Sequence, residues 1–254
     1  MSVSRYALSV WWRNAAMYRR TWKLNILPNF FEPILYLVSI GIGVGAYVSQ
    51  MGGTSYVAFL APGLVAVAAM NGASFEVTYN AFVRLNFEKT YASMLTTPIQ
   101  PDDVLAGEVL WAMTRAAIYG SIFYAVIAAA GLAPLPSSLW ALPLIPLTGL
   151  LFAALGIAFS LRIPNIDLFS FYFTLFLTPL FLFSDVFFPL AERLPPWGLR
   201  VAEALPLLHP VRLMRAAFRG EFRPILIWDL AYILALSAAL LWIAARITRR
   251  RLSE

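Results

Sequence analysis

Long apolar stretches alternate with short polar links along this chain. Six of these stretches are each about as long as the ~20-residue helix that crosses the hydrocarbon core of a bilayer. They cover residues 27–48, 56–77, 105–130, 139–161, 168–188 and 225–245. The pattern predicts an all-α polytopic membrane protein with six transmembrane helices.

Residues 1–25 precede the first stretch and are too rich in charge to be a span. Their apolar side chains recur at helical spacing: Leu8, Trp11, Trp12, Ala15, Tyr18 and Trp22. Basic side chains such as Arg13, Arg20 and Lys23 occupy the remaining positions. A basic, Trp-rich amphipathic helix lies in the plane of the lipid headgroups. We expect an interfacial helix here, which serves either as an anchor or as a mechanical lever.

The link at 189–223 is long, and prolines divide it into two short amphipathic helices near 196–204 and 210–219. It is too polar to cross the membrane and too apolar to be free in water. We therefore expect a re-entrant or interfacial helical hairpin on the outer side, between spans 5 and 6. No internal repeat is evident, so residues 1–254 form one domain: the N-terminal helix, spans 1–5 within 26–188, the hairpin, and the sixth span with a basic tail at 224–254.

The composition agrees with a membrane protein, since 61% of the 254 residues are hydrophobic and only 13% are charged. The net charge of +6 would also suit a nucleic-acid-binding protein, but basic residues that flank spans on the cytoplasmic side explain it better. The short links at 49–55 and 131–138 carry no Lys or Arg. Both termini are therefore predicted to be cytoplasmic.

The link before the third span contains more signals than a turn needs. Phe87, Tyr91, Met94 and Leu95 form one apolar stripe at helical spacing, and Thr96-Thr97-Pro98 ends it. Gln100 and then Pro101-Asp102-Asp103 start the next helix. We expect a short helix near 87–97 whose stripe either docks on a partner or folds back on the protein's own span ends.

Catalytic chemistry is not expected in this chain. No phosphate-binding loop of the G-x-x-x-x-G-K-[ST] type occurs, and the glycines of "GIGVGA" at 41–46 suit close helix packing at Gly41 and Gly45. The chain has no cysteine and a single histidine, which excludes the usual zinc sites. His209 is expected to cap a helix or to lie at the interface. We predict no metal site and no cofactor in this chain.

Polar and aromatic side chains inside the spans are candidates for a transport path. The candidates are Met70, Asn71, Phe75, Phe169, Tyr172, Phe173, Phe176 and Thr178. Ordinary helix packing explains them equally well. Glu76 and Arg115 are a possible pair that fixes the helices.

Two segments resemble a known family. "NFEKTYASMLTTPIQPDDVLAGEVLWAMTRAAIYG" and "FSDVFFPLAERLPPWGLRVAEALPLLHPVRLMRAAFRGE" look like the cytoplasmic signature and the outer hairpin of ABC-2-type permeases, especially those similar to the nodulation-factor export permease NodJ. With the leader and the spans, the resemblance covers nearly the whole chain.

This resemblance implies a multi-pass protein of a bacterial inner membrane that works as a homodimer. Each copy would pair with a separate ATPase subunit, where ATP and Mg²⁺ bind. The leader would be a connecting helix, and the coupling residues would be Glu88, Tyr91, Met94, Leu95, Thr96, Thr97 and Pro98. The cargo would be an amphipathic or saccharide-bearing molecule, exported by alternating access.

Two other functions remain open at this point. An ion-coupled secondary transporter would need repeats and carboxylates in mid-membrane, and these are nearly absent. A membrane enzyme that acts on lipid-linked sugars would need a cluster of acids, histidines or metal ligands. The acids near His209 are scattered among arginines.

Overall fold

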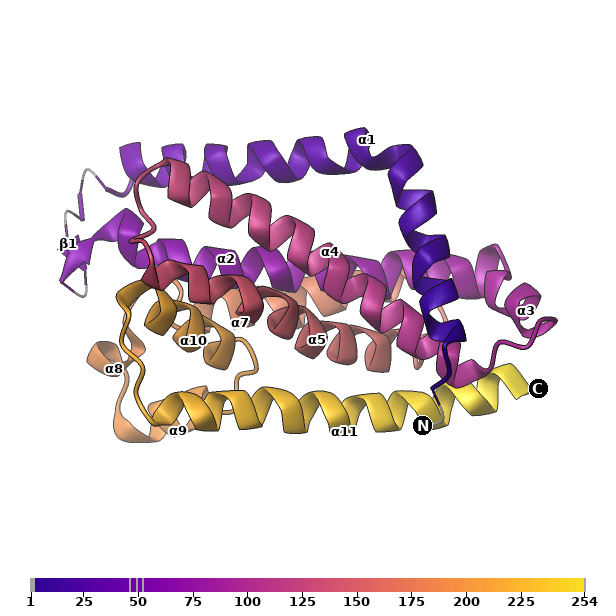
Figure 1. Ribbon diagram of the computed structural model, residues 1–254. Helices are drawn as coiled ribbons and strands as arrows, with labels where there is room; N and C mark the ends of the chain where they lie inside the picture. Colours follow the sequence, from indigo (N-terminus) through magenta and orange to yellow (C-terminus); the bar gives the residue numbers. More distant parts are fainter. Residues whose placement is uncertain (1–2, 46, 49, 52, 254) are drawn as a thin grey trace.

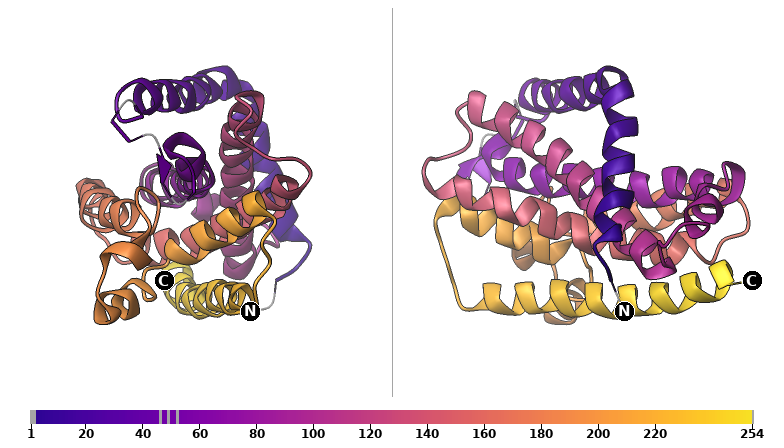
Figure 2. Two further views of the ribbon diagram at one scale, coloured as in Figure 1. Left: turned by 90° about the vertical axis from the view of Figure 1, so that its left-hand side faces the viewer. Right: turned by 45° about the vertical axis from the view of Figure 1, so that its right-hand side comes forward.

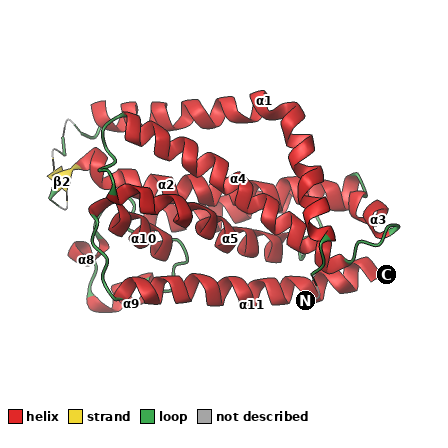
Figure 3. Cartoon of the chain, viewed as in Figure 1, coloured by secondary structure: helices red, strands yellow, loops and turns green. Residues whose placement is uncertain are grey.

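Helices dominate the computed structural model, which describes residues 3–253 apart from 46, 49 and 52 (Figure 3). The elements in chain order are α1 (Tyr6–Ile42), β1 (Gln50–Met51), β2 (Thr54–Ser55), α2 (Tyr56–Phe75), η1 (Glu76–Asn80), η2 (Val83–Phe87), α3 (Thr90–Leu95), α4 (Pro101–Ala129), η3 (Ser137–Trp140), α5 (Ala141–Ser160), η4 (Ile166–Leu168), α6 (Phe169–Phe171), η5 (Tyr172–Leu177), α7 (Thr178–Phe183), α8 (Leu190–Arg193), α9 (Pro196–Ala202), α10 (Leu208–Arg219) and α11 (Ile225–Ser253). The strands β1 and β2 form a small antiparallel hairpin.

Five helical segments of the described chain are long and apolar enough to cross a bilayer. They are Tyr56–Phe87, Pro101–Ala129, Ser137–Ser160, Ile166–Phe183 and Ile225–Arg250. Each overlaps one of the predicted spans, so the all-α polytopic class is confirmed. The predicted first span, 27–48, includes positions outside the described residues and remains a prediction, as does the packing at Gly41.

The long helices run roughly parallel, whereas the first part of α1 crosses them (Figure 1). Both chain ends and α3 lie at one end of the bundle, which we call the termini end. The β1–β2 hairpin, α8 and α9 lie at the opposite end, the hairpin end. The end-on view places α1 and α11 on opposite sides of the bundle (Figure 2). The bundle thus has two ends, separated by the length of its long helices.

The second span is longer than the predicted 56–77. Helix α2 continues through two π-helical segments, η1 and η2, to Phe87. The extension ends where Lys89 takes a left-handed backbone conformation with φ 51°. Because π-helical turns are frequent at functional sites, the polar residues of this extension are candidates for a functional role.

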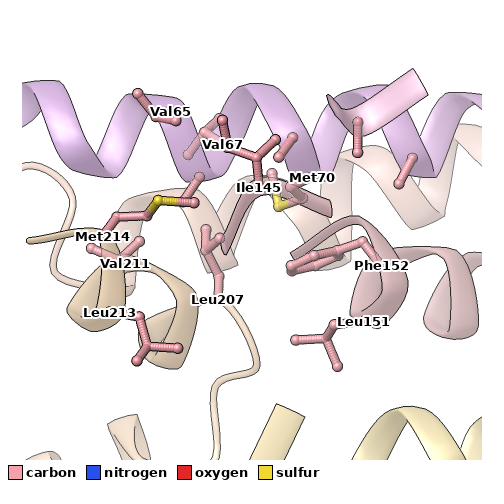
Figure 4. Packing of buried hydrophobic residues seen from close by; sticks show 14 of the residues in the cluster. Val65, Val67, Met70, Ile145, Leu151, Phe152, Leu207, Val211, Leu213 and Met214 are labelled. Carbon is pink, nitrogen blue, oxygen red and sulfur yellow. The ribbon is translucent and has the colours of Figure 1, made fainter. Parts of the chain in front are cut away.

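The core is centred on α2, which packs against α4, α5 and α10. Val65 and Met70 from α2 meet Ile145 and Phe152 from α5, and Met214 from α10 joins them (Figure 4). Helix α10 belongs to the predicted hairpin, yet it is buried against spans rather than lying on the surface. Its apolar face is therefore part of the hydrophobic core.

The N-terminal part of α1 has two apolar faces. Ala7 and Val10 are buried, whereas Leu8 and Trp12 are exposed. The buried face rests on α4 at Gly107, where an added Cβ would lie 2.5 Å from Val10 Cβ and 2.7 Å from the Ala7 carbonyl oxygen. Gly107 therefore allows the two helices to touch. The exposed face is available to the membrane interface.

We expect Gly107→Val to separate the start of α1 from α4. Overpacking of this kind costs about 1–3 kcal/mol, so the melting temperature of the purified protein in detergent should fall. Ala106→Val, at the neighbouring and only partly buried position, is the matched control and should change it little. Equal melting temperatures for the two variants would contradict the close contact.

Candidate functional site

Helix α3 forms the tip of the termini end (Figure 1). It is a six-residue helix, Thr90–Leu95, and is shorter than the predicted 87–97 because Phe87 still belongs to η2. The hydroxyl of Thr96 donates to the Ser93 carbonyl at 2.8 Å, and the hydroxyl of Thr97 donates to the Met94 carbonyl at 2.6 Å. The Thr-Thr-Pro sequence therefore ends the helix, as predicted.

The predicted coupling residues lie on different faces of this segment. Tyr91 is buried, Met94 and Leu95 are partly buried, and Glu88, Thr96, Thr97 and Pro98 are exposed. The apolar stripe is therefore divided. The burial of Tyr91 fits the alternative in which the stripe folds back on the protein's own span ends. Phe87 does not fold back in this way, since it is 66% exposed.

The buried Tyr91 ring lies beside Arg84 and Glu108. Burial raises the pKa of the Tyr91 hydroxyl, and the negative charge of Glu108 raises this pKa further. The hydroxyl is therefore neutral at physiological pH. Tyr91 attaches α3 to the bundle rather than presenting it to a partner.

The carboxylate of Glu108 joins three helical segments. It accepts a hydrogen bond from Asn14 of α1 at 3.0 Å and another from Arg84 of η2 at 2.5 Å. Glu108 itself is in α4 and is almost completely buried. One side chain thus connects α1, η2 and α4, next to the Tyr91 of α3.

A second buried carboxylate, that of Glu76, extends this connection. It accepts hydrogen bonds from Asn80 and Arg84, both at 2.8 Å. Arg115 of α4 approaches it to 3.8 Å, which confirms the expected Glu76–Arg115 pair. The guanidinium of Arg115 also lies 4.6 Å from the centre of the Tyr18 ring.

We call this group the ion network. Its members are Asn14, Glu76, Asn80, Arg84, Glu108 and Arg115. Its two carboxylates and two guanidinium groups balance in charge. Because removing one member of a buried pair leaves an unpaired charge, the network holds its helices in one arrangement.

A polar cavity of about 260 Å³ lies beside the ion network. Arg13 and Tyr18 of α1 line it on one side, and Glu76 and Arg84 line it on the other. Its walls offer hydrogen-bond donors and acceptors of both charge signs. Such a lining suits the polar part of a ligand.

An apolar cavity of about 290 Å³ lies deeper between the spans. Five of the predicted path residues line it: Met70, Asn71, Phe75, Phe173 and Thr178. The other three predicted residues are outside its lining. Phe169 is buried in a separate cluster with Phe82 and Ile163, and Tyr172 is buried with its ring against Phe176. These three rings pack against other aromatic side chains of the protein.

The two cavities follow one another along the second span. Residues between 64 and 75 line the apolar cavity, and residues between 76 and 84 line the polar one. On α4, Tyr119 lines the apolar cavity and Arg115 lines the polar one. Arg115 donates a hydrogen bond to the Tyr119 hydroxyl between them. An amphipathic molecule matches this order of surfaces.

The single histidine lies elsewhere than expected. His209 is fully buried, with Nδ1 2.7 Å from Asp229 Oδ1 and Nε2 3.0 Å from the Glu203 backbone oxygen. Glu203, His209 and Asp229 place potential ligand atoms within 4.8 Å of one another. However, Arg212 already contacts Glu203 at 2.5 Å and Asp229 at 3.2 Å. The cluster therefore fits an ion-paired joint between α10 and α11 better than a metal site.

Sequence reasoning missed four members of the ion network. Asn14 and Asn80 carry no signal of their own, Glu108 lies within the predicted third span, and Arg84 lies between the predicted second and third spans. One signal was available: Glu76, Asn80 and Arg84 recur at spacings of four residues, which places them on one helix face. The contribution of Asn14 depends on how α1 folds back, which spacing does not reveal.

Comparisons with known proteins agree with this architecture. Residues 6–218 match the family model described as ABC-2 type transporter. The chain is 40% identical over 214 residues to Nodulation protein J of Rhizobium leguminosarum bv. trifolii, covering 84% of this chain and 81% of that protein. It is 33% identical to Nodulation protein J of Neorhizobium galegae over 97% of this chain and 94% of that protein. Inner membrane transport permease YadH of Escherichia coli K12 is 27% identical over 84% of this chain and 81% of that protein.

We expect Arg84→Gln to destabilise the protein by about 3–5 kcal/mol, because Glu76 and Glu108 lose their shared cation. The double variant Arg84→Gln/Glu108→Gln restores the charge balance and should recover part of the loss. Thermal unfolding in detergent measures both. If the double variant is less stable than Arg84→Gln by the full cost of a second independent change, the charge-balance interpretation is wrong.

Proposed function

The chain belongs to the ABC-2 type transporter family, and on that premise we propose that it is the permease subunit of an ATP-driven exporter. ATP would be hydrolysed with Mg²⁺ by a separate subunit. The observation that carries the proposal is α3, a short helix held at the termini end by a buried tyrosine while its opposite face stays exposed.

The exposed face of α3 and the residues around it would dock in a groove of the ATPase. Phe87 offers an apolar side chain and Glu88 offers a charge, and both are exposed. Ala92, Ser93 and Thr96, which follow along the same segment, add small exposed side chains. A short helix with such a face suits insertion into a groove of a partner. Tyr91, on the buried face of α3, would hold the helix in position for docking.

The ion network would carry the movement of α3 into the bundle. When the ATPase moves α3, Tyr91 moves against Arg84 and Glu108, and Glu108 in turn holds Asn14 of α1. Arg13 of α1 also donates to Thr90 of α3 at 3.4 Å. The N-terminal helix and α3 would thus move together, as the lever interpretation of the leader requires.

The cargo would be amphipathic, with its polar part in the 260 Å³ cavity and its apolar part in the 290 Å³ cavity. Phe75 lines the apolar cavity and is 47% exposed, and a second copy of the chain would cover this surface. The dimer would then enclose a path that switches between inner and outer access. The termini end would face the cytoplasm of a bacterial cell.

The buried carboxylates argue against an ion-coupled transporter. Glu76 and Glu108 are each within 2.8 Å of Arg84, and a proton-binding carboxylate needs to exchange its charge. The proposal therefore keeps ATP as the energy source.

We expect Ala92→Arg to weaken capture of the partner ATPase about tenfold or more, the effect of roughly 1.4 kcal/mol. The change adds bulk to the exposed face and removes no contact, because Ala92 is exposed and arginine is a good helix former. The measurement is co-purification of the protein with candidate ATPase subunits in detergent, followed by the rate of ATP hydrolysis.

Ala191→Arg is the matched control, since Ala191 is an exposed alanine on a short helix at the hairpin end. It should leave capture unchanged. Capture of no ATPase by the unaltered chain, or equal capture by both variants, would contradict docking at α3.

A further inference from the structure

The first part of α1 crosses the direction of the spans (Figure 1). Because the spans cross the bilayer, a helix that crosses them lies along the membrane surface. One face of this part is fastened to α4. The Trp11 indole nitrogen donates to the Thr114 hydroxyl at 2.9 Å, and the Tyr18 ring lies 5.6 Å from the Trp111 ring. These contacts occupy one face of the helix only.

A second face of the same helix carries a row of mainly apolar side chains. The members of this row recur at spacings of four and three residues, which places them side by side along the helix. They are Leu8, Trp12, Ala15, Arg19 and Trp22, and we call them the outer stripe. Leu8, Trp12 and Trp22 are 60%, 68% and 45% exposed. The outer stripe is therefore a surface that contacts the surroundings of the protein.

Arg19 interrupts the outer stripe with a positive charge. It is exposed and makes no ion pair or hydrogen bond with the residues that the structure describes. Lys23, one turn further on, is also exposed and has no ion-pair partner in that part of the chain. Its Nζ lies 6.0 Å from the centre of the Trp22 ring. By contrast, the arginines of the ion network are paired with carboxylates. Two positive charges beside an exposed tryptophan are thus left to interact with groups outside the described chain.

The outer stripe matches the layers of a bilayer surface. Exposed tryptophans lie at the headgroup level, and a long basic side chain among apolar neighbours extends its charged end to the phosphates. The first part of α1 also lies back from the tip formed by α3 (Figure 1), and the tip is the part expected to meet an ATPase. Position and chemistry therefore favour a lipid surface over a soluble partner.

We propose that the outer stripe and Lys23 bind the headgroups of anionic phospholipids. Arg19 and Lys23 contact the phosphate groups, since charge-assisted hydrogen bonds from these cations to phosphate are strong. Trp12 and Trp22 lie at the level of the headgroups. Anionic lipid is preferred to zwitterionic lipid, because the surface of an anionic bilayer has a negative potential that attracts basic segments. This binding needs neither ATP nor an ATPase.

Bound lipid also affects the segment to which α3 is attached. Arg13 of α1 donates to Thr90 of α3 at 3.4 Å, and Asn14 of α1 donates to Glu108 at 3.0 Å. An anionic bilayer that holds the outer stripe therefore holds these two contacts in place. The effect on transport rests on the proposed function, whereas the lipid binding does not.

The test is titration of the purified chain in a neutral detergent with phosphatidylglycerol, with phosphatidylcholine as the zwitterionic comparison. Native mass spectrometry counts bound lipid, and hydrogen exchange locates it on the chain. Arg19→Gln removes the charge of the outer stripe, and Arg19→Gln/Lys23→Gln removes both charges. Arg20→Gln is the matched control. It makes the same change at the neighbouring exposed arginine, which lies about 100° further around the helix and outside the row.

We expect phosphatidylglycerol to bind more tightly than phosphatidylcholine and to slow amide exchange in residues 6–23. Arg19→Gln should weaken phosphatidylglycerol binding about fivefold, the double variant should weaken it further, and Arg20→Gln should change it much less. The replaced side chains are exposed, so the melting temperature without lipid should be unchanged. Added sodium chloride should weaken binding of the anionic lipid, because salt screens exposed charges.

Equal binding of the two lipids, or an equal loss in Arg19→Gln and Arg20→Gln, would overturn the proposal. So would lipid binding that leaves exchange in residues 6–23 unchanged. Loss of ATPase capture in Arg19→Gln, with lipid binding unchanged, would assign the outer stripe to a protein partner instead. The two proposals fail separately. Capture of an ATPase by a chain without lipid preference contradicts only this one, and phosphatidylglycerol bound at the outer stripe of a chain that captures no ATPase contradicts only the proposed function.

Discussion

A buried carboxylate, that of Glu108, is the constraint on which the termini end depends. Removing a charge from water is costly unless partners compensate for the lost hydration. Here the partners come from different elements, Asn14 of α1 and Arg84 of η2. The charge can be satisfied only when these helices are assembled together. The arrangement of α1, the second span and α4 is thus determined by polar chemistry as well as by apolar packing.

In the proposed mechanism, this constraint connects the short helix α3 to the bundle. An isolated six-residue helix is marginal in water, so α3 depends on its attachment through Tyr91 and on the Thr-Thr end signal. Tyr91 lies beside Glu108, and Glu108 accepts the hydrogen bond from Asn14 of α1. In the proposed mechanism, a force on α3 would therefore reach α1 by a short path. The polar cavity lies along this route, and the apolar cavity continues from it.

The features that depend on local sequence pattern could be predicted from the sequence. Spans 2 to 6 follow from apolar length alone, and the end of α3 follows from Thr96, Thr97 and Pro98. The Glu76–Arg115 pair was also predictable, since two opposite charges inside spans need one another. The direction of Tyr91, the role of Asn14 and the burial of His209 were not predictable. Each depends on which helices meet in three dimensions, and the extension of α2 through π-helical turns changes the face on which its later residues lie.

Hydrogen exchange in Glu108→Gln tests most directly whether one carboxylate holds this end together. The variant keeps the shape of the side chain and removes its charge. The account predicts that amide exchange becomes faster together in residues 6–23 of α1 and in α3, while α10 at the hairpin end is unchanged. Faster exchange confined to α4, or a uniform increase that includes α10, would contradict it.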